Sequence, residues 1–134
     1  MSGETDLQSM LSDLKPVLLP DRYVFCTVKD ADYGDLAHTQ PLASFRETEG
    51  LTLVVSEESA LREALEFEGT FRCITLQVHS SLEAVGLTAA VADALAKQNI
   101  CANVIAGYYH DHVFVPSDRA DHAVALLQSL NRNV

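Results

Sequence analysis

The stretch ITLQVHSSLEAVGLTAAVADALAKQNICANVIAGYYHDHVFV, residues 74–115, decides the fold of this chain. Apolar and other residues alternate at its start, which is typical of a β-strand with one covered face. The next part, 86–98, is rich in alanine and leucine and predicts a helix. Apolar runs at 100–106 and 112–116 predict two strands on either side of a turn. The expected order is therefore strand, helix, strand, strand.

The rest of the chain extends this order and repeats it. A helix capped by a serine is expected at 117–130, with acidic residues in its first turn. The first half has a strand at 23–28 and then a polar loop at 29–40. Two strands that turn around Gly50 and a helix that starts after a serine complete this half. A short helix at 6–14 is expected before the repeat.

These elements predict an α+β fold of tandem ferredoxin-like βαββαβ units, with an antiparallel sheet and helices on one face. We place the N-terminal unit at 1–66 and the C-terminal unit at 67–134. The first unit should lack its first helix, because Gly34 and several acids occupy that position. Two complete units need more strands than are evident here. Either strand 71–78 also closes the first unit, or strand 23–28 completes the second.

Length and charge exclude several classes of protein. With 134 residues, the chain suits one ordinary domain or two very small domains that share a core, and a 48% hydrophobic share supports that core. The net charge of −10 disfavours binding to nucleic acid and to anionic membranes. No apolar run is long enough for a membrane span, and residues 1–14 lack the basic start of a secretory signal. We expect a soluble, cytoplasmic protein.

The three cysteines predict neither a disulfide framework nor a nucleophile. Cys26, Cys73 and Cys101 are odd in number, and none is spaced as in a CxxC motif. Each lies in an apolar run. We therefore expect all three to be small buried hydrophobic residues.

Residues 74–115 resemble an ACT domain, the small ligand-binding unit of aspartate kinases and related amino-acid enzymes. The strand, the Gly-Leu pair at a helix start and the block LAKQNICANVI carry this resemblance. Residues 16–130, with the blocks YVFCTV, FRETEGLTLVV, VHSSLEAVGLTAA and YYHDHVFVP, are similar to small stand-alone bacterial proteins with tandem ACT-like domains. The resemblance implies a regulatory or sensor module that binds a small molecule, an amino acid, without catalytic activity.

The expected site is the start of the helix near Leu87. Its free backbone N–H groups and positive dipole end suit a carboxylate, and Gly86 leaves room for one. Asn103 or Glu83 would accept from the ligand's ammonium group. The predicted ligand-binding residues are His79, Ser80, Ser81, Glu83, Val85, Gly86, Leu87, Thr88, Asn103, Tyr108, Tyr109 and His110. We expect this site at a seam between units or between the chains of a homodimer.

Other interpretations of the same residues stay open. Neighbouring first and third strands would bring His79 near His110 or His112, which could form a three-histidine metal site. A histidine base with Ser80 or Ser81 as nucleophile would suggest an enzyme, and a plain turn would suggest neither. No motif completes these sites, so we assign no catalytic residue, metal ligand or cofactor. The alternative function is a ligand-free module for protein interaction or dimerisation.

Overall fold

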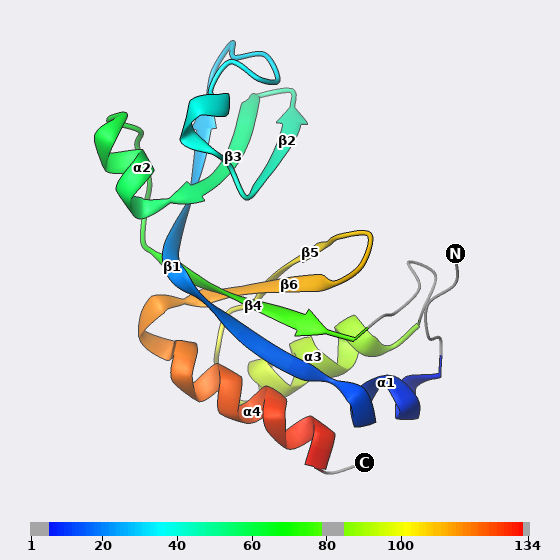
Figure 1. Ribbon diagram of the computed structural model, residues 1–134. Helices are drawn as coiled ribbons and strands as arrows, with labels where there is room; N and C mark the ends of the chain where they lie inside the picture. The colour runs from blue at the N-terminus through cyan, green and yellow to red at the C-terminus, as the bar shows by residue number, and fades with distance from the viewer. Residues whose placement is uncertain (1–5, 79–84, 133–134) are drawn as a thin grey trace. The chain divides into compact units, whose positions relative to one another are not determined.

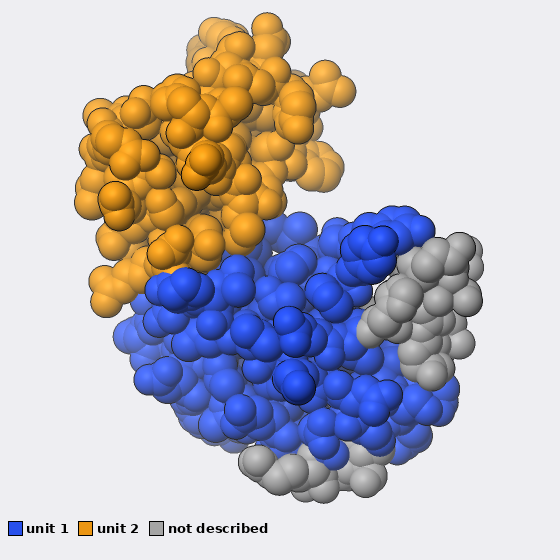
Figure 2. Space-filling model, viewed as in Figure 1, with its two compact units in different colours: residues 1–20, 72–134 blue, residues 21–71 orange. Residues whose placement is uncertain are grey.

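The computed structural model describes residues 6–78 and 85–132, and it divides into two compact units (Figures 1 and 2). Unit 1 contains residues 1–20 and 72–134, and unit 2 contains residues 21–71. The first part of strand β1 (Lys15–Val28) belongs to unit 1 and its last part to unit 2. The domain boundary predicted from the sequence, between residues 66 and 67, follows the repeat along the chain. It stays a prediction.

Unit 2 is a three-stranded antiparallel sheet with one α-helix. After β1 it contains η1 (Ala37–Thr39), β2 (Ala43–Glu47), β3 (Gly50–Ser56) and α2 (Glu57–Arg62). Its strand order is β2-β3-β1, and both strand pairs are antiparallel. Ser56 caps α2, because its hydroxyl accepts a hydrogen bond from the Ser59 N–H. Only one turn of 3₁₀-helix, η1, forms between β1 and β2, so the predicted absence of the first helix is confirmed.

The core of unit 2 lies on one face of this sheet. Alternate residues of β3 and β1 point to this face and are almost fully buried. They are Val24, Cys26, Leu51, Leu53 and Val55. Side chains from α2 and from the loop before β2 cover them.

Unit 1 contains the complete repeat. Its elements besides β1 are α1 (Leu7–Asp13), β4 (Phe71–Gln77), α3 (Leu87–Ala96), β5 (Asn103–Ala106), β6 (Asp111–Pro116), η2 (Ser117–Arg119) and α4 (Ala120–Arg132). The strand order is β1-β4-β6-β5. Strands β4 and β6 are therefore neighbours, as predicted for the first and third strands of the motif.

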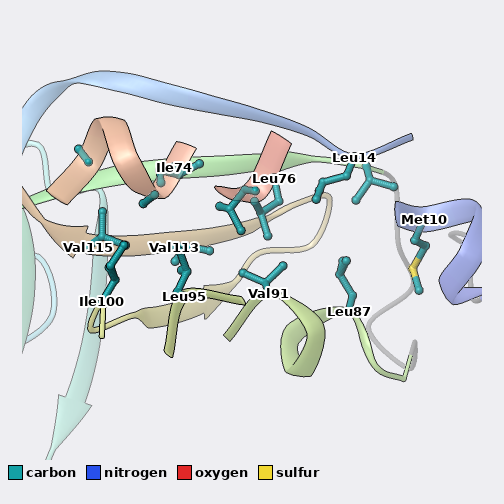
Figure 3. Close-up of a cluster of buried hydrophobic side chains, with 14 residues drawn as sticks. Met10, Leu14, Ile74, Leu76, Leu87, Val91, Leu95, Ile100, Val113 and Val115 are labelled. Atoms are coloured by element: carbon teal, nitrogen blue, oxygen red, sulfur yellow. The ribbon is translucent and has the colours of Figure 1, made fainter. Parts of the chain in front are cut away.

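The core of unit 1 forms where three helices cover one face of this sheet (Figure 3). Strands β4 and β6 contribute alternate residues, and each helix contributes an apolar stripe. The fully buried members include Met10, Ile74, Leu76, Val91, Leu95, Val113, Val115 and Leu127. Burying each large side chain stabilises the fold by about 1.5–3 kcal/mol.

The start of β1 differs from the prediction. The strand begins at Lys15 rather than at Tyr23, and Pro16 and Pro20 lie within it. The predicted strand start at residue 23 was therefore wrong, because the fixed φ of proline suits extended backbone where no ladder N–H is needed. The guanidinium of Arg72 on β4 also donates to the carbonyl oxygen of Leu19, at 2.8 Å.

The cysteines confirm the prediction in part. Cys26 and Cys73 are buried free thiols, and burial raises the pKa of the Cys73 thiol to about 11. Cys101 is exposed, so its predicted burial was wrong. It lies in the connection between α3 and β5, where the chain has left the helix and not yet entered the sheet.

Among the described residues, no helix has the length and apolar character needed to cross a membrane.

Gly50 provides a test of the unit 2 sheet. A Cβ added there would lie 2.9 Å from Thr27 Oγ1 and 3.0 Å from the carbonyl oxygen of Val28, both on the paired strand β1. We expect Gly50→Ala to lower the free energy of unfolding by about 1–3 kcal/mol, measured by urea denaturation.

The control for this prediction is Gly34→Ala. Gly34 also has a positive φ, of 97°, but a Cβ there would have no atom within 4 Å. The free energy of unfolding of Gly34→Ala should fall by about 1 kcal/mol, which reflects backbone strain alone. Equal losses in the two variants would contradict the close approach of β1 and β3 at Gly50.

Candidate functional site

The predicted ligand-binding residues fall into three groups in the structure. His79, Ser80, Ser81 and Glu83 lie outside the described residues. The others belong to unit 1 and lie at the start of α3, at the turn between β5 and β6, and at the start of β5. The described members of the predicted site therefore come from three parts of unit 1.

The start of α3 is an open helix N-terminus. Gly86 precedes the helix in the left-handed conformation, with φ of 100°, and it offers no capping side chain. The first turn has no acidic residue. The side chain of Leu87 is buried in the core, whereas Val85 and Thr88 are exposed. Leu87 could therefore contribute only its backbone N–H to a ligand.

Helix α1 borders this N-terminus, which sequence analysis did not foresee. A Cβ added to Gly86 would lie 3.2 Å from Cδ2 of Leu7. The space that glycine leaves is therefore filled on this side by a leucine, and not kept open for a carboxylate. Met10 and Leu14, both buried, anchor the same segment in the unit 1 core.

The turn between β5 and β6 presents two aromatic rings. Gly107 N–H donates to the carbonyl oxygen of His110 at 2.9 Å, which closes the turn. The rings of Tyr108 and Tyr109 meet edge to face, with centroids 5.0 Å apart. Both side chains are more than half exposed, so both are available to a ligand or a partner.

The histidines next to this turn lie in a partly buried, charged environment. His112 Nδ1 lies 3.0 Å from Thr75 Oγ1 on the neighbouring strand β4. Burial lowers the pKa of His112, and the nearby His110 lowers it further. Burial raises the pKa of Asp111, against the effect of the two histidines. His110 Nδ1 is buried and has no hydrogen-bond partner among the described residues.

The metal-site interpretation gains no support from these contacts. Its third histidine, His79, is outside the described residues. Within residues 6–78 and 85–132, no cluster of three or more histidine, cysteine or acidic side chains could hold a metal ion.

Asn103 lies apart from the turn. It begins β5, opposite Phe114, while the turn follows the other end of the strand. Three residue steps of strand separate these ends by about 10 Å. The Asn103 amide nitrogen lies 3.8 Å from Cys101 Sγ. The structure therefore does not place Asn103 next to Tyr108, Tyr109 and His110.

Unit 2 also contains a groove that was not predicted from the sequence. The groove has a volume of about 390 Å³ and runs between the loop before β2 and strands β2 and β3. Its walls include Tyr33, Leu36, Leu42, Ser44, Leu51 and Leu53. The sequence held one signal for this groove. It predicts a loop between β1 and β2, so a loop rather than a helix covers this part of the sheet.

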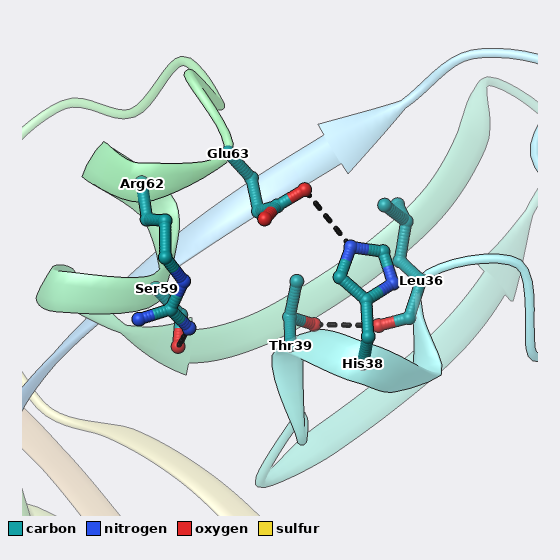
Figure 4. Close-up of polar contacts among 6 residues, drawn as sticks. All are labelled: Leu36, His38, Thr39, Ser59, Arg62 and Glu63. Atoms are coloured by element: carbon teal, nitrogen blue, oxygen red, sulfur yellow. Dashed lines mark hydrogen bonds and ion pairs between the residues drawn. The ribbon is translucent and has the colours of Figure 1, made fainter.

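Polar contacts fix the loop that forms one wall of the groove (Figure 4). The imidazole Nε2 of His38 lies 2.9 Å from the Glu63 carboxylate, just after α2. The Thr39 hydroxyl donates to the carbonyl oxygen of Leu36 at 2.7 Å, and Thr39 is buried. Side-chain contacts therefore hold the loop in place, whereas a long helix would be held by its own backbone hydrogen bonds.

Two ferredoxin-like units in tandem are the architecture of this chain. One ACT domain model matches residues 2–72 and a second matches residues 68–129. The chain therefore belongs to the ACT domain family, whose members typically bind amino acids as regulatory modules. No curated protein matches the chain.

Solved structures share this fold. A protein of unknown function from Vibrio cholerae, described as a possible transport protein, is 49% identical, with a TM-score of 0.86 over 93% of this chain and 95% of that one. A protein from Agobacterium tumefaciens has 17% identity and a TM-score of 0.73 over 88% and 89% of the two chains. The ligand-free regulatory subunit of aspartate kinase from Thermus thermophilus has 10% identity and a TM-score of 0.58 over 86% and 95%.

The lowered pKa of His112 predicts a dependence of stability on pH. Below the unfolded pKa of about 6.5, the unfolded state binds this proton more readily than the native state does. The contribution of His112 is therefore present at higher pH and is lost as the pH falls through about 6.5. Replacing His112 by Gln should make the free energy of unfolding vary less between about pH 7.5 and pH 5, as measured by urea denaturation.

His122→Gln is the matched control. His122 is exposed on α4, so this variant should keep the pH dependence of the wild-type protein. If His112→Gln also keeps it, the burial of the His112 imidazole does not set this dependence.

Proposed function

We propose that the protein is a small-molecule-binding regulatory or sensor module without catalytic activity, that it acts in the cytoplasm, and that its ligand is a free amino acid. Both halves of the chain match ACT domains, and amino-acid binding is typical of that family. Unit 1 has the complete strand, helix, strand, strand, helix order. We therefore assign the ligand to unit 1.

The start of α3 is the observation that carries this proposal. The backbone N–H groups of Leu87 and Thr88 have no hydrogen-bond partner within the described part of the chain. Together with the positive end of the helix dipole, they suit a ligand carboxylate. On a protein with a net charge of −10, such a positive end is a favourable place for an anion.

The rest of the site follows from the size and charges of an amino acid. Tyr108, Tyr109 and His110, at the turn between β5 and β6, would contact the ligand's side chain. Glu83 or Asn103 would accept from its ammonium group, and the place of Asn103 at the other end of β5 favours Glu83. Helix α1, through Leu7, would form one wall beside Gly86.

A binding role fits the described chemistry better than catalysis does. Thr75 and His112 form a hydroxyl–imidazole pair, which is one requirement for nucleophilic catalysis. However, the Thr75 side chain is only 8% exposed, so a substrate would not reach it. This burial supports a structural role for the pair.

We extend the proposal to a homodimer. Strands β2 and β5 end the strand order, and each has one described strand neighbour. An edge strand presents free backbone N–H and C=O groups that a second chain can pair with. The exposed tyrosines next to β5 would add apolar contact area to such a pairing.

The test of amino-acid binding is thermal stability against the twenty common amino acids. A ligand at 100 times its Kd should stabilise the native state by about 2.7 kcal/mol, which raises Tm by several degrees for a domain of this size. At least one amino acid should give this shift. A flat response across the panel would contradict the proposal and favour the ligand-free interaction module.

Two substitutions locate the site. Gly86→Asp should abolish the shift, because its side chain crowds Leu7, strains the left-handed backbone before α3 and adds a negative charge near the start of the helix. Thr88→Asp tests the same repulsion at an exposed first-turn position, where an acid also stabilises the helix. Ala125→Asp, exposed on α4, is the control and should keep the shift. A full shift in folded Thr88→Asp protein would place the ligand elsewhere.

A further inference from the structure

A comparison of the two units shows which helix is missing beside the groove in unit 2. In unit 1 the chain order β4, α3, β5, β6 gives the sheet order β5-β6-β4. In unit 2 the chain order β1, loop, β2, β3 gives the equivalent sheet order β2-β3-β1. The loop at residues 29–42 therefore takes the position of α3, which buries Leu87, Val91 and Leu95 in unit 1.

The loop fills this position less completely than a helix does. It contains one turn of 3₁₀-helix, and the groove of about 390 Å³ remains between it and the sheet. Leu51 and Leu53 form the floor, and Leu36 and Leu42 stand at the sides. The volume lies in the range of small-molecule sites, roughly 300–1,000 Å³, and the lining is mostly apolar as in such sites.

Polar side chains gather at one mouth of the groove. A second hollow adjoins it, shares Tyr33 and Ser44 with it, and is also lined by Phe45 and Arg46. On β2, Ser44 pairs with Leu53 and Arg46 pairs with Leu51. Directly paired residues share a face of the sheet, so Ser44 and Arg46 lie on the same face as the groove floor.

Arg46 is an unpaired cation in an acidic unit. It is exposed and forms no ion pair or hydrogen bond within the described ranges, although acids outnumber bases in residues 21–71. Its neighbour Glu47 belongs to the opposite face and accepts from the Thr52 hydroxyl. The hydroxyls of Ser44 and Tyr33 likewise have no partner in the described part of the chain. Three donors are therefore available beside an apolar groove.

We propose that this groove binds a small carboxylate with an apolar tail. The tail lies among Leu36, Leu42 and Leu53, where it replaces contacts that a helix makes in unit 1. The carboxylate pairs with the Arg46 guanidinium, whose planar fork of N–H groups matches two oxygens, and the Ser44 hydroxyl donates to it. This site is in unit 2 and does not depend on the amino-acid site proposed in unit 1.

The first experiment titrates the full chain, labelled with ¹⁵N, with 3-phenylpropanoate and with its neutral analogue 3-phenylpropanamide. The acid should give saturable amide shifts at Leu36, Leu42, Ser44 and Leu53, with a Kd at least about tenfold below that of the amide. Equal binding of the two compounds would overturn the role of Arg46. Saturable shifts confined to α3, or no saturable shifts, would overturn the site itself.

Two pairs of variants test the two halves of the site. Arg46→Gln should weaken binding of 3-phenylpropanoate about tenfold and leave the amide unchanged, whereas Arg22→Gln, an exposed arginine of the same unit, should change neither. Leu42→Asp should abolish binding of both compounds, because it places a charge among the apolar walls. Leu61→Asp makes the same change at a 65% exposed position on α2 and should have no effect.

Tm and the dispersion of the amide spectrum establish that each variant is folded. Wild-type affinity for the acid in folded Arg46→Gln protein would overturn the proposal. The amino-acid panel reports on unit 1 by a different ligand and different residues, so either proposal can fail while the other stands.

Discussion

Each unit must cover one apolar sheet face, and most other features of the structure follow from this requirement. Strand pairing satisfies the backbone hydrogen bonds but leaves the apolar face of the sheet uncovered, so helices or loops must cover that face. Unit 1 meets the requirement with three helices around Ile74 and Leu76. Unit 2 has α2 and a loop held by His38 and Thr39. The polar contacts hold that loop in place, and its apolar side chains Ala31 and Leu36 pack on the sheet as those of α3 do in unit 1.

The sequence predicts this architecture because alternation and helical spacing are local signals. The order of elements in residues 74–115, the pairing of their first and third strands and the missing helix of the first half were all predicted correctly. The start of β1 was not, because a proline in an extended strand has the same local signature as a proline that ends one. The exposure of Cys101 depends on where a short connection leaves the core, which an apolar run does not specify.

The site was harder to predict, because it depends on contacts between residues far apart in the chain. Gly86 was correctly placed at a helix start, but only the fold shows that Leu7 lies against it. The hydrogen bond between Thr75 and His112 requires the register of β4 and β6, which no turn between them fixes. The groove near Arg46 was not predicted at all. It is a property of what the loop leaves unfilled, and the residue types alone do not show it.

The differing exposure of the three thiols has a practical consequence for labelling. Cys26 and Cys73 are buried, and burial raises the pKa of both thiols, so few thiolates form at neutral pH. Cys101 is exposed between α3 and β5. A thiol-reactive fluorophore would therefore attach at this one position of the folded wild-type chain. A probe there would follow the connection behind α3 without any engineered cysteine.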